Sequence, residues 1–351
     1  MKVVSSGSNI TYTVTKSYAL KGTLLSQSTL QSLTESRDLA DLITKLKATP
    51  YSDSVSKVQQ PYSGYKIELA VREHVSSLHY NLMKVYPDAS VLYAYYMKYI
   101  VGDLKTVLKG KAIGRSYEEI QRYLDMHAEE LIRRRDLIAR AVAVASLDEV
   151  VTTFRGTEFY KVIDNAVKTY RSTQKLDVFD VYLDRALYDG ILETAPRKGF
   201  GRLRPLIAVD VDSYNVLAIL RAKSWEVSQA QVRSLIVEPT FDAPKNILER
   251  MIAAATVADA IRYLAGTRYR NLVPQDSEND ATMISSFEEA FRRFGYQRAT
   301  RPFLWDAFTE SVVLGIIRLK ELEARNISAI AFGVEHSLGP KAIMQKLIYA
   351  R

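Results

Sequence analysis

The spacing of apolar residues predicts helices along almost the whole chain. Between residues 70 and 85 these positions recur at intervals of three and four, which places them on one face of a helix. They are Val71, His74, Val75, Leu78 and Leu82. Pro87 is expected to end this helix, because its ring cannot continue the backbone hydrogen-bond ladder. A second helix is expected over residues 88–109.

Polar and turn-forming residues predict where further helices begin. Ser116 precedes Glu118 and Glu119, so its hydroxyl is expected to cap a helix that carries acidic residues in its first turn. Ser228 is expected to open a later helix in the same way, and Pro340 is expected to open the equivalent third segment.

The apolar stripe after Ser116 predicts one helix with a charged, solvated opposite face. The stripe consists of Ile120, Tyr123, Leu124 and Leu131, and the charges opposite are Glu119, Arg122, Asp125 and Glu129. Residues 206–211 read as a strand or as a helix. We expect a helix, because no partner strand is near, and the predicted fold is therefore all-α.

One short pattern occurs three times. Each copy is a run with helical spacing, a small residue, and then Thr-x-aromatic. The three threonines are Thr49, Thr157 and Thr267, which lie 108 and 110 residues apart. Such spacing is typical of a triplicated unit, and a chain built of repeated helical units favours a scaffold or connector over an enzyme.

A second series supports the first. Similar apolar helices contain Asp103, Asn215 and Asn326, which are 112 and 111 residues apart. Chance resemblance between leucine-rich helices is the alternative explanation. The two series together predict three similar helical domains of about 110 residues. The expected boundaries are 1–117, 118–227 and 228–351.

Composition limits the class of protein. The chain has 351 residues, 47% of them hydrophobic, so each third is long and apolar enough to form a core. It has no cysteine, which excludes disulfides and thiolate metal sites. No apolar run has the roughly 18 residues of a spanning helix, and no signal peptide is evident, so a soluble protein that is not exported is expected.

The sequence offers no convincing catalytic, cofactor or metal site. His74 and His79 lie five residues apart, on different faces of one helix, and no His-Glu-x-x-His pattern occurs. His74 is expected to be a packed core histidine. The Gly199-Phe200-Gly201 segment lacks the third glycine and the βαβ context of a dinucleotide loop, so a basic linker is expected.

The formal net charge of +8 favours an anionic partner, which leaves nucleic acid, a membrane surface and an acidic protein open. Basic residues gather in three places, and aromatic residues accompany the last two. These clusters are Arg133–Arg135, then Arg197, Lys198, Arg202 and Arg204, then Arg292, Arg293, Arg298 and Arg301. Glu129 and Glu130 precede the first cluster, which is therefore expected to be a solvated helix face.

Several of these residues match a known family. The chain resembles the C subunit of archaeal-type (A-type) ATP synthases, which is similar to the d subunit of V-type ATPases. The matching residues are Tyr12, Lys16, Ala19, Lys21, Leu24 and Leu25; Leu46, Thr49 and Tyr51; Asn215, Leu220, Arg221 and Lys223; and Lys320, Glu321, Glu323, Asn326 and Ile327. Lys16 and Ser328 stand where the family usually has Arg, and Val334 stands where it usually has Lys.

The resemblance implies a non-catalytic connector with no cofactor and no metal. In this family three helical domains form a pseudo-threefold funnel, present in one copy per complex on the cytoplasmic face of the membrane. The expected partners are the membrane rotor ring of proteolipid subunits and the central shaft, and not nucleic acid. The funnel passes torque between ring and shaft during proton- or sodium-driven ATP synthesis, or during ATP-driven pumping.

We expect the loop with Arg197, Lys198, Arg202 and Arg204 to contact acidic residues of a partner, with an affinity that falls as salt rises. Two other functions remain open at this point. One is a helical scaffold for acidic proteins outside any rotor, and the other is a nucleic-acid-binding helical protein.

Overall fold

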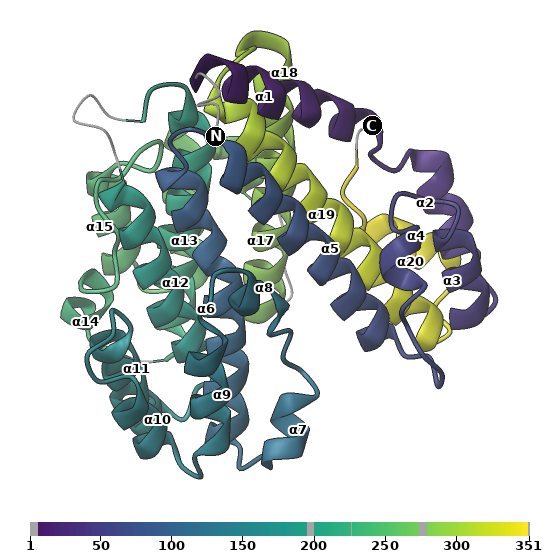
Figure 1. Ribbon diagram of the computed structural model, residues 1–351. Helices are drawn as coiled ribbons and strands as arrows, with labels where there is room; N and C mark the ends of the chain where they lie inside the picture. Colours follow the sequence, from purple (N-terminus) through teal and green to yellow (C-terminus); the bar gives the residue numbers. More distant parts are fainter. Residues whose placement is uncertain (1–5, 195–199, 226, 274–278, 350–351) are drawn as a thin grey trace. The chain divides into compact units, whose positions relative to one another are not determined.

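The computed structural model describes residues 6–194, 200–225, 227–273 and 279–349. Within these ranges all regular elements are helical and there is no strand, which confirms the all-α fold (Figure 1). The α-helices are α1 (Ser6–Gly22), α2 (Gln27–Thr34), α3 (Leu39–Leu46), α4 (Ser52–Val55), α5 (Gly64–Val85), α6 (Ser90–Ala112), α7 (Tyr117–Gln121), α8 (His127–Leu131), α9 (Arg135–Ala143), α10 (Leu147–Thr153), α11 (Tyr160–Thr173), α12 (Asp177–Glu193), α13 (Arg204–Lys223), α14 (Gln229–Arg233), α15 (Lys245–Ala253), α16 (Val257–Arg262), α17 (Asp280–Thr300), α18 (Pro302–Trp305), α19 (Glu310–Glu335) and α20 (Pro340–Lys346). Three short 3-10 helices are η1 (Gly201–Leu203), η2 (Tyr263–Gly266) and η3 (Arg270–Leu272).

The chain forms two compact units. Unit 1 combines Met1–Leu92 with Tyr296–Arg351, and unit 2 comprises Tyr93–Gly295. Unit 1 is therefore built from two segments that lie far apart in the sequence. The three domains over 1–117, 118–227 and 228–351, and their arrangement as a funnel, stay predictions.

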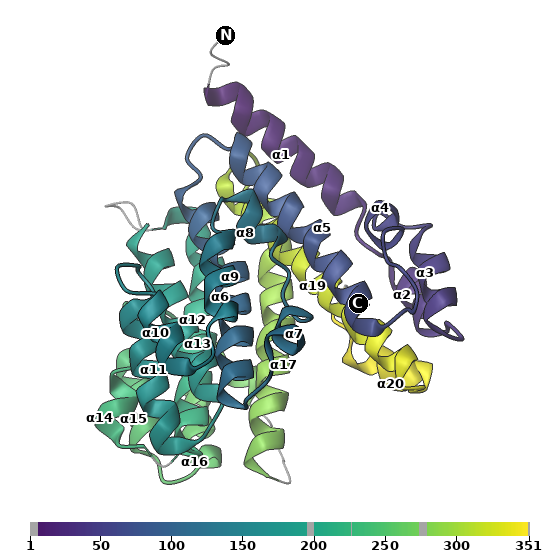
Figure 2. The same cartoon turned by 60° about the horizontal axis from the view of Figure 1, so that its bottom comes forward.

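Unit 1 is organised around the antiparallel pair α5 and α19, which lie side by side in both views (Figure 2). Gly64, at the start of α5, lies against the end of α19. A Cβ at this position would be 2.8 Å from Glu335 Oε2 and 3.3 Å from the backbone of Ala331. The buried side chains of α3, α5 and α19 form one core that includes Leu42, Ile67 and Ile327. The absence of a side chain at Gly64 thus permits the close approach of the two helices.

Unit 2 contains a deeply buried helix, α13. Its buried residues lie on all sides, and polar residues are among them, namely Asp210, Asp212 and Asn215. Residues 206–211 are helical, as expected. Their nearly continuous apolar run reflects burial on every side, because such a helix has no polar face to produce a 3.6-residue period.

The expected helix starts are confirmed, but one predicted helix is divided. Ser116 forms a capping box with Glu119, and the Ser228 hydroxyl accepts a hydrogen bond from Gln231 N. Pro340 begins α20. The stripe after Ser116 is split between α7 and α8, and Asp125 is buried at the break, where its carboxylate accepts a bond from His127 N. The prediction of one helix with solvated Asp125 and Glu129 was therefore wrong, and Glu129 is also buried.

The three Thr-x-aromatic segments have the same hydrogen bonds. Each threonine hydroxyl donates to the carbonyl three residues before it, at 2.6 Å for Thr49 and 2.8 Å for Thr157 and Thr267. Each threonine Oγ1 also accepts from the backbone N–H of the aromatic residue, at 3.0–3.3 Å. The sequence repeat therefore corresponds to a repeated structural corner that ends one helical turn and directs an aromatic side chain inward.

The corner of unit 1 places Tyr51 in a buried charged cluster. Its hydroxyl donates to Glu323 Oε1 at 2.8 Å, and Lys320 Nζ donates to the same oxygen at 2.7 Å. The other carboxylate oxygen accepts from Leu25 N. Lys320 is fully buried, so the ammonium and the carboxylate neutralise one another inside the core.

One of the two corners in unit 2 places Tyr269 against Asp212 of α13. The tyrosine hydroxyl donates to Asp212 Oδ2 at 2.7 Å. The corner of unit 1 has an ammonium beside its carboxylate. The Asp212 carboxylate instead accepts hydrogen bonds from the backbone N–H groups of residues 241–243, at 2.7–3.2 Å. Burial raises the pKa of Asp212 to about 6, and the hydrogen bonds from Tyr269 and the backbone limit the shift.

The third corner is apolar. Phe159 is buried and carries no hydroxyl. Glu323 and Asp212 lie three residues before Asn326 and Asn215. The residue three before Asp103 is Ile100, which is also buried. The tyrosine and the carboxylate are therefore both replaced by apolar residues in this copy.

Candidate interaction surfaces

The basic segment before α13 is only partly described. Arg197 and Lys198 lie outside the described residues. Arg202 is exposed on η1, and the Arg204 guanidinium lies over the Phe241 ring, 5.4 Å from its centroid. Pro205 follows Arg204 in the first turn of α13, where its fixed φ favours the helix start. The structure brings Arg202 and Arg204 to the start of one buried helix, and their role in partner contact stays a prediction.

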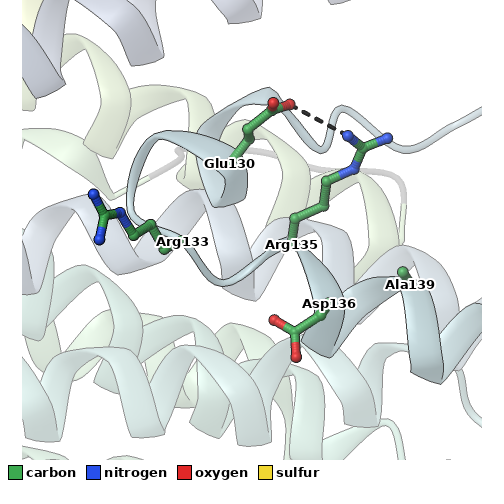
Figure 3. Close-up of a pocket in the computed structure, with 5 residues that line it drawn as sticks. All are labelled: Glu130, Arg133, Arg135, Asp136 and Ala139. Atoms are coloured by element: carbon green, nitrogen blue, oxygen red, sulfur yellow. Dashed lines mark hydrogen bonds and ion pairs between the residues drawn. The ribbon is translucent and has the colours of Figure 1, made fainter.

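Arg133 and Arg134 form the turn between α8 and α9, and Arg135 begins α9, which corrects the predicted continuous helix face. Arg133 has a φ of 60°, and this left-handed backbone ends the helix. Arg135 pairs with Glu130 at 3.4 Å, whereas Arg134 pairs with Glu158, which lies beyond α10. An open depression is lined by Glu130, Arg133, Arg135, Asp136 and Ala139 (Figure 3). Its charges are mixed and solvated, so it does not form a selective anion site.

The third basic cluster is largely neutralised within α17. Arg292 pairs with Glu288 at 2.5 Å, and Arg293 pairs with Glu289 at 2.6 Å, both at i,i+4 spacing. This spacing is visible in the sequence and would have predicted the pairs. Of the four cluster residues only Arg301, after the end of α17, is exposed. The cluster is therefore not a continuous basic patch.

Charged pairs also join neighbouring helices of unit 2. Lys105 bonds Asp184 and Lys109 bonds Asp180, each at 2.6 Å, linking α6 to α12. Burial raises the pKa of Asp184, and Lys105 opposes that shift. Arg221 of α13 pairs with Glu288 of α17 at 3.0 Å. These pairs fix helix against helix and leave their charges unavailable to a partner.

His74 is a packed histidine, as expected. Its Nδ1 lies 3.2 Å from Ser54 Oγ, and its ring lies 4.6 Å from that of Tyr51. Burial lowers its pKa, with a further contribution from Lys320. Among the described residues no three acidic or histidine side chains are grouped so that they could hold a metal ion.

An exposed apolar segment spans the end of α18 and the connection to α19, and no sequence pattern indicated it. Leu304, Trp305 and Phe308 are 67%, 78% and 62% exposed. In the sequence they resemble core residues, because apolar type alone does not reveal burial. We refer to Leu304, Trp305 and Phe308 as the apolar knob.

Glu310 follows the apolar knob at the first position of α19. Burial and the nearby Asp88 carboxylate raise the pKa of Glu310 to about 7. Tyr86 lies in the same region, where burial and Glu310 raise the pKa of its phenol to about 12. Glu310 therefore carries less than a full negative charge near neutral pH.

Comparison with known proteins identifies the family. A family model described as ATP synthase (C/AC39) subunit matches residues 13–346. The chain belongs to this family.

Relatives in the ATP synthase (C/AC39) subunit family match at low identity but over nearly the whole chain. The A-type ATP synthase C subunit of Methanocaldococcus jannaschii is 24% identical over 332 residues, which cover 93% of this chain and 82% of that protein. The C subunit from Pyrococcus horikoshii is 24% identical, with 93% and 87% covered. That of Methanosarcina barkeri is 23% identical, with 97% and 93% covered.

Two structural findings accompany the family membership. The matched range contains all three corners. Within the described ranges no helix has both the length and the apolar character required to cross a bilayer.

Proposed function

We propose that this protein is the non-catalytic connector in the central stalk of a rotary A-type ATP synthase. In this role it joins the membrane rotor ring to the central shaft and passes torque between them, on the cytoplasmic face of the membrane and in one copy per complex. The supporting observation is the family match over residues 13–346, together with relatives named as C subunits of A-type ATP synthases that match over most of their length.

The internal packing suits a part that transmits torque. Such a part must deform little under load, and close-packed helical interiors have low compressibility. Buried hydrogen bonds also fix the packed segments relative to one another. The bond between Tyr51 and Glu323 joins segments 272 residues apart in the sequence. Lys105 and Lys109 tie α6 to α12 in unit 2. Each unit is thus braced internally by polar contacts as well as by apolar packing.

The repeated corner supports the proposal of three similar domains. The three threonines form the same two hydrogen bonds, and Asn215 and Asn326 each bond both backbone groups of the residue 22 positions later. A funnel of three domains, as the family resemblance implies, would use this repetition to bridge a broad ring and a narrow shaft.

Purification from native membranes tests the proposed function. A tagged chain should co-purify with the catalytic subunits and the proteolipid ring in a fixed stoichiometry. Recovery of the chain without any other ATP synthase component would contradict the proposal. Retention on nucleic acid at physiological salt would instead favour a nucleic-acid-binding protein.

A second experiment tests the basic segment. Neutralising Arg197, Lys198, Arg202 and Arg204 to glutamine should weaken binding to the shaft subunits and reduce its salt dependence. The matched control neutralises Arg37, Lys47, Lys57 and Arg155, which lie at other places on the chain. Equal affinity and equal salt dependence in the two variants would show that the segment has no part in docking.

A further inference from the structure

The apolar knob is a large exposed apolar feature of unit 1. Three bulky side chains within five residues present most of their surface to solvent, with Trp305 at 78% exposure. Protein surfaces rarely gather such groups unless they serve an interaction with a protein or a membrane. Scattered single apolar residues need no such explanation.

The backbone that carries the knob is firmly held. Phe303 is buried, its carbonyl accepts the Tyr18 hydroxyl at 3.0 Å, and the two rings meet edge to face. Thr309 Oγ1 donates to the Asp306 carbonyl at 2.6 Å and so closes the loop before α19. Figure 1 shows α18 beside α1. The exposed side chains of the knob are therefore carried on a backbone that is fixed by buried contacts.

Basic groups flank the knob. Arg301 is exposed directly before α18, and the Lys21 ammonium lies 4.8 Å from the centroid of the Phe303 ring. The acidic residues of the connection, Asp306 and Glu310, are partly buried. Asp88, which lies near Glu310, is exposed. The knob itself combines Trp, Phe and Leu with adjacent cations, which is the composition of protein segments that enter the interface of an anionic bilayer.

We propose that the apolar knob inserts into the headgroup region of an anionic lipid bilayer, with Arg301 and Lys21 contacting lipid phosphates. A protein groove is the less favoured occupant, because the cations beside the knob match a uniformly anionic surface. This contact is separate from the connector role, since it requires only lipid.

The test uses the full chain and vesicles of purified lipid, so that no rotor protein is present. Vesicles of phosphatidylcholine with about one third phosphatidylglycerol should bind the chain and blue-shift its tryptophan emission, and brominated lipid should quench that emission. The emission change reports Trp305, because the chain's other tryptophan, Trp225, is buried. Trp305→Ser and Phe308→Ser should each lower partitioning by about tenfold.

Matched variants separate the contributions. Phe332→Ser removes another exposed aromatic residue, on α19, and should leave partitioning unchanged. Arg301→Gln and Lys21→Gln should each weaken binding to anionic vesicles by about fivefold and leave binding to pure phosphatidylcholine unaffected. Thermal melts should match the wild type, since the substituted knob side chains are exposed.

Three results would overturn the proposal. They are failure to bind anionic vesicles, binding without a change in Trp305 emission, and binding that the serine variants do not reduce. Loss of association with ATP synthase membranes in the serine variants, without any lipid binding by the wild type, would assign the knob to a protein partner. None of these results bears on co-purification with the ATP synthase, which tests the connector role.

Discussion

The Tyr51 corner of unit 1 and the Tyr269 corner of unit 2 differ in how they stabilise a buried carboxylate. Both tyrosines donate to a carboxylate at 2.7–2.8 Å. In unit 1 the Lys320 ammonium supplies the opposite charge, whereas in unit 2 three backbone N–H groups stabilise Asp212. In both corners a tyrosine hydroxyl donates to the carboxylate, which is further stabilised by an ammonium in one corner and by backbone N–H groups in the other.

The apolar corner at Phe159 extends this comparison. Phe159 stands in place of the tyrosine, and Ile100 occupies the position that corresponds to the carboxylate. Losing only one member would leave a buried polar group without a partner, which costs free energy. The tyrosine and the carboxylate are thus replaced together by apolar residues, while the threonine hydrogen bonds are common to all three corners.

The largest expected effect comes from breaking the charged corner. Glu323→Gln should lower the free energy of unfolding by about 3–5 kcal/mol, because it leaves Lys320 charged and buried without a counter-ion. Urea denaturation measures the change. Glu249→Gln, which breaks the more exposed pair with Arg233, serves as the control and should cost less than about 1 kcal/mol. Equal losses in the two variants would contradict the distinction.

The pH dependence of stability should single out the Tyr269 corner of unit 2. The pKa of Asp212 is about 6 in the folded protein, against an unperturbed value of 3.8. The folded state therefore holds this proton more tightly, so the contribution of Asp212 to stability is greatest below pH 4 and is lost as pH rises through 6. The difference amounts to about 3 kcal/mol.

Asp212→Asn removes this titration. Unfolding measured from pH 4 to 7 should therefore show a smaller decline in the variant than in the wild type. Asp242→Asn, which alters a neighbouring carboxylate that pairs with the exposed Arg268, should retain the wild-type slope. A wild-type slope in Asp212→Asn would mean that other groups cause the decline.

The apolar corner provides a test of equivalence. Phe159→Tyr should destabilise the protein by about 1–3 kcal/mol, since the new hydroxyl is buried without a carboxylate acceptor. In a double-mutant cycle, adding Ile100→Asp should give a favourable coupling of about 1 kcal/mol between the two sites. Strictly additive effects would show that position 100 does not correspond to Asp212 and Glu323.

The smallest effect should be the same in all three corners. Thr49→Val, Thr157→Val and Thr267→Val each remove the same donor and acceptor, so each should cost about 1 kcal/mol. Thermal unfolding of the three single variants measures these losses. A loss confined to one corner would show that the similar hydrogen bonds do not contribute similarly.

The features that could be predicted from the sequence are those that depend on residues close together along the chain. Helix periodicity, the capping residues Ser116 and Ser228, and the threonine series all depend on residues within a few positions of each other, and the structure has them in place. The break between α7 and α8 was not predicted, because it depends on the burial of Asp125, which results from tertiary packing. The helix that each corner contacts was also not predicted. Tyr51 and Glu323, for example, are brought together only by tertiary packing.

The candidate surfaces were harder to predict for the same reason. Basic residue type suggested patches, but Arg292 and Arg293 are occupied by glutamates on their own helix. Trp305 and Phe308 are of residue types that are typical of a core, but their side chains are exposed to solvent. Exposure is a property of the whole packed chain, and a one-dimensional pattern does not contain it.

The joining of Met1–Leu92 to Tyr296–Arg351 also has a consequence for biosynthesis. The ribosome emits the first of these segments long before the second. At about 5–20 residues per second, the roughly 200 residues between them take on the order of 10–40 seconds to translate. During that interval Tyr51 has no Glu323 to meet, and the nascent α5 exposes the face that α19 later covers. The middle of the chain is therefore expected to fold first, and chaperones have a defined window in which to protect its beginning.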